Sequence, residues 1–204
     1  MNEITIARDL LQNKFICPVS DELAYFWLKD HSNFKRMQSN LAPLGVKLVS
    51  FGDNEVYAGL NIAMSDSDKK KVVKDFESIH HNISPIVDVL IALSTADENG
   101  DILYPGMTLK HDRLVILVNN NKDFESRLHK VSRENNSISK ANDAQIEAML
   151  QKLQKEGLVV LTNATKKIYK VTGKIEYINR IIEFINDNYL SEADFIAEQQ
   201  GLDL

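Results

Sequence analysis

The sequence predicts an α+β protein that is mostly helical, and three observations support this fold class. One layout, a helical stretch followed by a glycine and two short strands, occurs twice along the chain. Apolar residues recur at helical spacing between the two copies and after the second. The 204 residues, 44% of them hydrophobic and 26% charged, suffice for two small packed domains. The residues that recur at identical spacings are Leu41, Gly45 and Tyr57 in the first copy and Leu153, Gly157 and Tyr169 in the second.

The first copy is expected to start with a short helix over residues 4–11 and a small strand over residues 15–17. Ser20 is then expected to cap a second helix, because a serine hydroxyl can accept a hydrogen bond from the first free backbone N–H groups. Asp21 and Glu22 follow it, and their negative charge is favourable in the first turn.

A third helix of the first copy is predicted to end at Gly45, because glycine readily takes the left-handed conformation that stops a helix. Residues 46–51 and 56–62 then have the pattern of two strands around the polar turn 52–54. The apolar face of the third helix is expected to consist of Phe34, Met37, Leu41 and Leu44.

The helices of the second copy are predicted in the same way. Residues 109–118 and 124–131 are apolar segments that we expect to be helical. Asn142 is expected to cap a further helix, with Gln145 three residues on completing a capping box. The buried face of this helix is expected to consist of Ile146, Met149, Leu150 and Leu153.

After Gly157, residues 158–161 and 167–172 are rich in β-branched side chains and are predicted to be strands around the polar turn 162–165. A helix, a glycine and a two-stranded wing form the second half of a winged helix. We therefore predict tandem winged-helix domains with a helical connector and a C-terminal helix. The expected parts are an N-terminal domain over 1–65, the connector and its loop over 66–106, a C-terminal domain with the final helix over 107–190, and an acidic tail over 191–204.

The connector shows helical periodicity over residues 68–96. Pro85 is expected to kink or break this helix, because proline removes a hydrogen bond and clashes with the preceding turn. Residues 97–101 and 105–106 are expected to form the loop that follows. A final amphipathic helix is predicted from the spacing of Ile175, Ile178, Ile181, Ile182, Ile185 and Tyr189.

The formal net charge of −5 is unevenly distributed. Residues 66–106 carry −4 and residues 191–204 carry another −4, whereas residues 107–190 carry +4. A basic segment of this size is usually only a solvated face, although it also leaves room for phosphate binding. Uninterrupted apolar runs such as residues 114–118 are too short to cross a membrane, and we expect a cytoplasmic protein without membrane contact.

The chain carries none of the common catalytic motifs. Its eight glycines form neither a dinucleotide-binding fingerprint nor a phosphate loop. His80 and His81 are neighbours on a predicted helix and point about 100° apart, so they cannot ligate one metal ion together. Cys17 is expected to be a small buried apolar residue. We therefore expect no enzyme activity, no catalytic residues, no cofactor and no metal site.

Several segments, in their order and spacing, resemble the MukE/MksE-type subunits of bacterial condensin, and the resemblance spans nearly the whole chain. It implies a fold of two winged helices and a dimeric binding protein of the kind called a kite subunit. The segments that carry it are Phe15-Ile16-Cys17, Ser20-Asp21-Glu22, Leu44-Gly45-Val46-Lys47-Leu48 and Val56-Tyr57, followed by residues 84–90, 105–106 and 169–178.

The resemblance also implies partners. A kite subunit binds a kleisin and, through it, an SMC-like ATPase, in chromosome organisation or, in related systems, plasmid defence, which places the protein at the nucleoid. The alternative is a winged-helix transcription regulator, whose helix enters the major groove of DNA. The side chains available for base reading are Asn33, Lys35, Arg36, Gln38 and Asn40 in the first domain, and Gln145, Lys152 and Lys155, without an arginine, in the second.

Three binding surfaces are expected. Lysines around the second wing suit weak, sequence-independent contact with the phosphates of double-stranded DNA, and these are Lys152, Lys155, Lys166, Lys167 and Lys170. Aromatic residues of the N-terminal domain are candidates for a homodimer interface unless they form its core, and these are Phe15, Tyr25, Phe26, Trp27 and Phe34. Apolar stripes that exceed what two small cores need are candidates for kleisin binding, and these contain Ile86, Leu90, Leu93, Ile178, Ile182 and Ile185.

Overall fold

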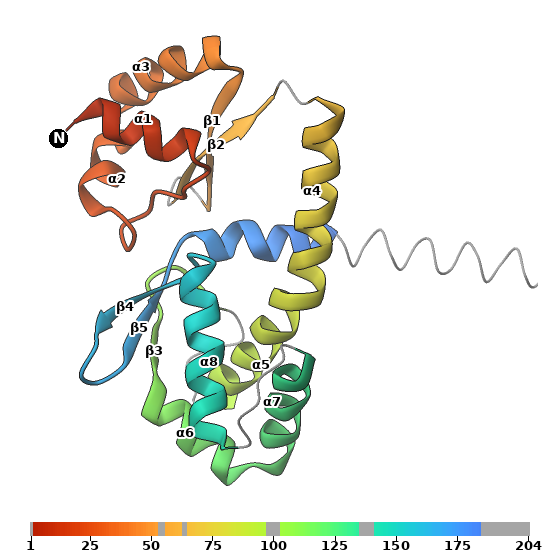
Figure 1. Ribbon diagram of the computed structural model, residues 1–204. Coiled ribbons are helices and arrows are strands. Elements are labelled where there is room, and N and C mark those ends of the chain that lie inside the picture. Colours follow the sequence, from red (N-terminus) through yellow and green to blue (C-terminus); the bar gives the residue numbers. More distant parts are fainter. Residues whose placement is uncertain (1, 53–55, 63–64, 97–102, 135–140, 185–204) are drawn as a thin grey trace, which may run out of the picture.

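The computed structural model describes residues 2–52, 56–62, 65–96, 103–134 and 141–184. These residues form a mostly helical α+β protein with small sheets, as the sequence predicts. Figure 1 shows a first unit, residues 2–62, above a second unit, residues 79–184, and the long helix α4 (Asp66–Ser78) linking them. Within the described residues, no helix has both the length and the apolar character needed to cross a membrane.

The first unit consists of three helices and a hairpin, and its described elements are α1 (Glu3–Leu11), α2 (Glu22–Lys29), α3 (His31–Leu41), a 3₁₀ turn (Ala42–Leu44), β1 (Val46–Phe51) and β2 (Val56–Asn61). The strands β1 and β2 pair antiparallel. The small strand predicted at residues 15–17 is a single bridge, in which Ile16 and Tyr57 exchange backbone hydrogen bonds. The helices pack Leu10, Leu28 and Met37 into a core against the hairpin.

The start of α2 differs from the prediction that Ser20 caps it. Asp21 is the capping residue, because its side chain accepts a hydrogen bond of 2.9 Å from the N–H of Ala24. The hydroxyl of Ser20 instead donates to the carbonyl of Phe15 at 2.8 Å and accepts from the N–H of Cys17 at 3.0 Å. Ser20 therefore closes the turn before the helix and does not cap the helix itself.

The described elements of the second unit are α5 (Ser84–Ala96), β3 (Thr108–Lys110), α6 (His111–Asn120), α7 (Lys122–Glu134), α8 (Asn142–Lys155), β4 (Val159–Asn163), β5 (Ile168–Val171) and a final helix over residues 174–184. The strands lie in the order β3-β5-β4, with both pairs antiparallel. The helix predicted over 109–118 begins only at His111, because Leu109 pairs with Tyr169 in the sheet.

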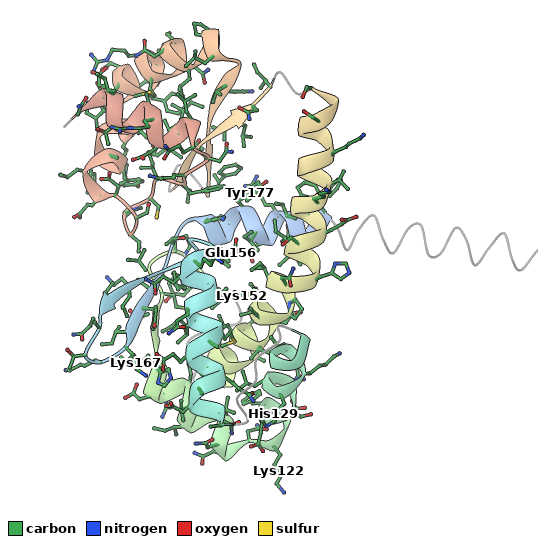
Figure 2. The ribbon with its side chains drawn as sticks, viewed as in Figure 1. Lys122, His129, Lys152, Glu156, Lys167 and Tyr177 are labelled. Atoms are coloured by element: carbon green, nitrogen blue, oxygen red, sulfur yellow. The ribbon has the colours of Figure 1, made fainter. Side chains whose placement is uncertain are left out.

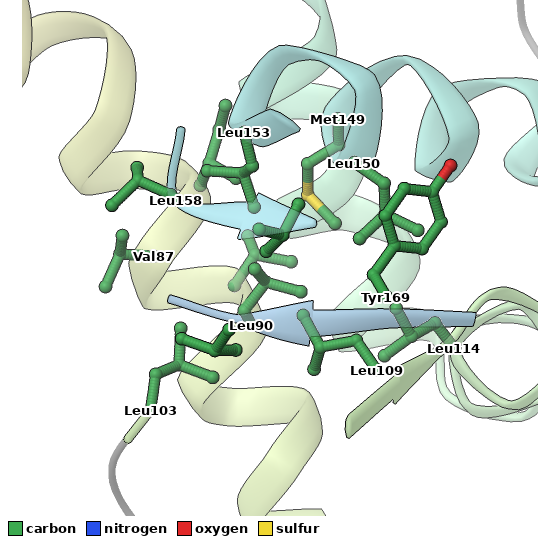
Figure 3. Packing of buried hydrophobic residues seen from close by; sticks show 14 of the residues in the cluster. Val87, Leu90, Leu103, Leu109, Leu114, Met149, Leu150, Leu153, Leu158 and Tyr169 are labelled. Atoms are coloured by element: carbon green, nitrogen blue, oxygen red, sulfur yellow. The ribbon is translucent and has the colours of Figure 1, made fainter. Parts of the chain in front are cut away.

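The core of the second unit includes α5, which the sequence analysis assigned to the connector. Val87 and Leu90 of α5 are buried together with residues of α8 and the sheet, such as Leu150 and Tyr169 (Figure 3). Burying such aliphatic side chains contributes roughly 1.5–3 kcal/mol each. The domain boundaries placed at residues 65, 106 and 190 stay a prediction, and the acidic tail from residue 191 lies outside the described residues.

The kink or break expected at Pro85 corresponds to an irregularity within a continuous helical segment. A π-helical stretch, Ile79–Ile83, lies between α4 and α5 and ends two residues before this proline. Proline has no N–H to donate and its ring crowds the carbonyl four residues earlier, so regular α-helical bonding cannot continue through this point.

The start of α8 also differs from the prediction. Asn142 is the first residue of the helix and makes no capping bond, and the capping position belongs to Ala141. The side-chain amide of Asn142 instead donates to Oδ1 of Asn119 at 2.9 Å and to Oε1 of Glu125 at 3.0 Å. Its hydrogen bonds therefore hold α8 against α6 and α7.

The sequence repeat corresponds to equivalent positions in the two units. Gly45 and Gly157 both have left-handed backbone, with φ of 71° and 73°. Tyr57 is paired with Ile16, and Tyr169 is paired with Leu109. In each unit, the extended segment that precedes the paired helices thus adds to the second strand of the hairpin.

Candidate functional site

The two units meet at the start of the final helix. The N–H of Gly173 donates a buried hydrogen bond of 3.2 Å to Sγ of Cys17. A Cβ atom at Gly173 would lie 2.2 Å from Cγ2 of Val56 and 2.9 Å from Cβ of Cys17, so only glycine fits this approach. Cys17 is fully buried, as the sequence predicts, and its sulfur has this additional structural role.

Aromatic rings surround this contact. The ring of Tyr177, on the final helix, lies 5.1 Å from the ring of Phe15 and 6.1 Å from the ring of Phe51, measured between centroids. Arg180 lies over the ring of Phe51 at 5.5 Å. Packing of this kind contributes about 0.5–1.5 kcal/mol per pair beyond burial. The final helix is thus attached to the first unit as well as to the second.

A cavity of ≈ 370 Å³ lies beside this junction. Its walls come from three parts of the chain: Phe15 and Leu60 in the first unit, Ile79 of the π-helical stretch, and Leu158 and Tyr177 in the second unit. The walls combine apolar side chains with a few polar groups, which is the usual character of a ligand-binding cavity.

The residues predicted to bind a kleisin differ in burial and in location. Ile86 and Leu90 are buried in the core of the second unit, where their side chains are already packed. Ile178 is also buried but lines the cavity at the junction, and Ile182 is half-buried against the core. The side chain of Leu93 and all of Ile185 lie outside the described residues.

The residues predicted to form a dimer interface also divide into two groups. Tyr25 is buried in the first core, and Trp27 and Phe34 pack partly buried against it. Phe15 contacts Tyr177 within the chain. Phe26 remains 57% exposed on α2, where the neighbouring turn carries Leu23 at 72% exposed, and α1 carries Ile4, also 72% exposed.

The lysines predicted to contact DNA lie in different surroundings, and their contact with DNA stays a prediction. Lys167 lies on the second hairpin, before β5 (Figure 2). It donates a hydrogen bond of 2.7 Å to Oε2 of Glu147, which raises the pKa of this lysine and lowers the pKa of the glutamate. Burial lowers the pKa of Lys152. Lys155 is exposed, eight residues beyond Glu147 on α8, a rise of about 12 Å.

The two remaining lysines, Lys166 and Lys170, are exposed on the second hairpin. Lys166 precedes Lys167 in the turn between β4 and β5, and Lys170 lies on β5 opposite Val160. Three of the five predicted lysines, Lys155, Lys166 and Lys170, are therefore exposed.

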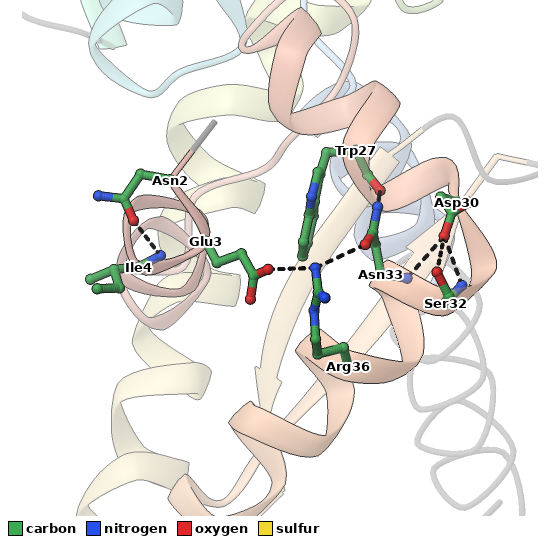
Figure 4. A network of polar contacts seen from close by, with 8 residues as sticks. All are labelled: Asn2, Glu3, Ile4, Trp27, Asp30, Ser32, Asn33 and Arg36. Carbon is green, nitrogen blue, oxygen red and sulfur yellow. Dashed lines mark hydrogen bonds and ion pairs between the residues drawn. The ribbon is translucent and has the colours of Figure 1, made fainter.

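The helices that would read bases are occupied by internal contacts. On α3, Arg36 bonds to Glu3 and Asn33 and lies over the ring of Trp27 at 5.3 Å (Figure 4). The side chain of Gln38 accepts a hydrogen bond from the N–H of Leu48 at 3.0 Å. On α8, Gln145 is buried, and the first two turns present the carboxylates of Asp143 and Glu147.

The sequence analysis missed one group of chemically active side chains. Ligand atoms of His111, Asp143 and Glu147 all lie within 4.8 Å of one another, where the start of α6 meets α8. His111 is buried, and its Nε2 lies 3.7 Å from Oδ1 of Asp143. The spacing of Asp143 and Glu147, four residues apart on one helix, is a signal that could have drawn attention to them.

Neither a protein-family model nor a curated protein matches the sequence. The function is therefore inferred from the residues and contacts described above.

Proposed function

We propose that the chain is a non-catalytic kite subunit of an SMC-like complex that binds a kleisin and, through it, the SMC-like ATPase. Its role is in chromosome organisation or plasmid defence. The observation that carries the proposal is that a similar order of elements occurs twice, on two separate cores joined by a long helix. The second copy has one more helix between its extended segment and its hairpin. This order of helix, extended segment, helices and hairpin is that of a winged helix, so the proposal includes two tandem winged-helix domains.

The attachment of the final helix supports a scaffolding role. The hydrogen bond between Gly173 and Cys17 and the packing of Tyr177 on Phe15 both connect the two units. A subunit that positions other proteins needs fixed geometry between its binding surfaces, and these contacts supply it.

The contacts on α3 and α8 favour protein binding over the alternative function of a transcription regulator. A bidentate arginine on guanine is the commonest specific base contact. Arg36 would have to leave Glu3, Asn33 and Trp27 to make it. On α8, the carboxylates of Asp143 and Glu147 would face the phosphates and repel them.

The cavity at the junction is the proposed docking place for the kleisin. It contains Ile178 of the predicted kleisin stripe and apolar side chains such as Leu60, which is 36% exposed on β2. An apolar contact of this kind is little affected by salt, because ions screen charge pairs and leave hydrophobic burial intact.

The test is complex formation between the purified chain and a candidate kleisin sought among the neighbouring genes. Mass measured by light scattering during gel filtration should show a complex at both low and moderate salt. Leu60→Glu should abolish the complex, whereas Ile62→Glu, a matched change at a 65% exposed residue outside the cavity, should preserve it. A complex that dissociates on modest addition of salt, or that tolerates Leu60→Glu, would contradict this docking place.

A further inference from the structure

The group formed by His111, Asp143 and Glu147 lies beneath the second hairpin, in a place that the proposed function does not use. His111 is the first residue of α6 and is 5% exposed, and the carboxylates come from successive turns of α8. The N–H of His111 donates to the carbonyl of Lys167 at 3.2 Å, so the group is tied to the turn of the hairpin. An open hollow of ≈ 610 Å³, lined by His111, Asp143 and Lys167 among others, gives access to it.

We infer that these three side chains form a binding site for a divalent cation of the zinc class, coordinated by one imidazole nitrogen and two carboxylates. In tetrahedral zinc sites the ligand atoms lie about 2.0–2.2 Å from the metal and so about 3.4 Å from one another. The distance from Nε2 of His111 to Oδ1 of Asp143, 3.7 Å, is already close to this value. The same Nε2 lies 3.2 Å from the backbone carbonyl oxygen of Asp143, a hydrogen bond that the metal has to replace. All three ligand atoms lie within 4.8 Å of one another, so rotation of the exposed Asp143 side chain and of the half-buried Glu147 side chain can close the site.

The chemistry of the donors selects the class of metal. A neutral imidazole with carboxylates suits zinc and its first-row neighbours, whereas calcium and magnesium prefer sites made of oxygen alone. Three protein ligands leave a fourth position for water.

The ammonium group of Lys167 occupies part of this site and competes with the metal. Its Nζ lies 2.7 Å from Oε2 of Glu147, where it neutralises the carboxylate that the metal needs. Metal binding therefore replaces the ammonium group of Lys167 beside Glu147 with the metal ion. It also releases the side chain of Lys167, which lies at the turn of the hairpin, toward solvent. Removing this lysine should strengthen metal binding.

The test is equilibrium dialysis of the full chain, freed of metal with a chelator, against Zn²⁺, with Co²⁺ absorption as a second probe of ligand geometry. The chain should bind one equivalent of Zn²⁺. Asp143→Asn changes a largely exposed carboxylate without disturbing the core and should weaken binding tenfold or more, as should His111→Asn. Lys167→Met should strengthen binding, by a similar factor.

His129→Asn is the matched control, because His129 also lies near a carboxylate, with its Nε2 3.9 Å from Oε1 of Glu125. This variant should bind Zn²⁺ as the unchanged chain does. The inference is overturned if neither the unchanged chain nor Lys167→Met binds saturably. It is also overturned if Asp143→Asn leaves the affinity unchanged or if His129→Asn removes the binding.

Discussion

Gly173 has no room for a side chain at the contact between the two units. Gly173→Ala would place a Cβ atom 2.2 Å from Cγ2 of Val56. We expect the variant to lower the free energy of unfolding by about 1–3 kcal/mol, the usual cost of overpacking a core. Urea denaturation followed by circular dichroism measures this change.

Val56→Ala provides the matched partner for that measurement. It removes the methyl groups that a Cβ at residue 173 would meet, so the two substitutions should interact. The double variant is expected to lose less stability than the sum of the two single losses. Strict additivity would show that the predicted clash does not occur.

The carboxylate of Asp30 is expected to make the stability of the fold depend on pH in the acid range. The hydroxyl of Ser32 and the N–H of Asn33 donate to its side chain, which holds the pKa of Asp30 below its ordinary value (Figure 4). A carboxylate whose pKa is lowered by folding contributes stability above its unfolded pKa, about 3.9. That contribution is lost as the pH falls through the lower, folded pKa.

Asp30→Asn isolates this effect, because asparagine keeps a capping oxygen but does not ionise in this range. Urea midpoints between pH 6 and pH 2.5 should fall more steeply for the unchanged chain than for the variant. Parallel pH profiles would contradict the assigned hydrogen bonds.

Single residues were predictable where local sequence decides their conformation. The left-handed glycines at positions 45 and 157 follow from the helices that they end. The capping role expected of Ser20 belongs to Asp21 because both side chains can cap and the local turn decides between them. The bond from Gly173 to Cys17 joins residues 156 positions apart, and no periodicity encodes such a contact.

At the scale of elements, the long helices and both hairpins were predictable from their apolar periodicity. The strand β3 was missed because it has only three residues, and its apolar Leu109 continues directly into the pattern of α6. The pairing of Lys167 with Glu147 was not predictable, because it depends on how the hairpin lies against α8.

The second hairpin carries the prediction on DNA. We expect weak, sequence-independent binding to duplex DNA, with a Kd in the range of about 10⁻⁴–10⁻⁶ M at physiological salt. Changing both Lys166 and Lys170 to glutamate should weaken binding and flatten its salt dependence, because exposed lysines contact phosphates as point charges. Fluorescence anisotropy of a labelled duplex across a salt series measures both.

Lys122→Glu combined with Lys130→Glu is the charge-matched control. Lys122 lies at the start of α7, away from the hairpin (Figure 2), and Lys130 is exposed further along the same helix. A larger effect from this control than from the hairpin variant would move the DNA contact away from the hairpin. If neither variant changes the affinity, the predicted contact between these lysines and DNA is wrong.

At the scale of the whole molecule, we expect a homodimer formed through the first unit. Leu23 and Phe26 lie three residues apart on α2, 72% and 57% exposed, which leaves an apolar surface for a second copy. Changing both to glutamate should give the mass of a monomer by light scattering at micromolar concentration. The same change at Ile116, 48% exposed on α6, should leave the dimer intact. A monomeric mass for the unchanged chain would contradict the expectation directly.

The central claim is that the chain binds other proteins of an SMC-like complex and performs no chemistry itself. Affinity purification of the tagged chain from the cells that naturally express it, followed by mass spectrometry, tests this claim most directly. The account predicts that a kleisin and a large coiled-coil ATPase are recovered together with the chain at moderate salt. Recovery of the chain alone, or with promoter DNA and the transcription machinery in place of these partners, would contradict it.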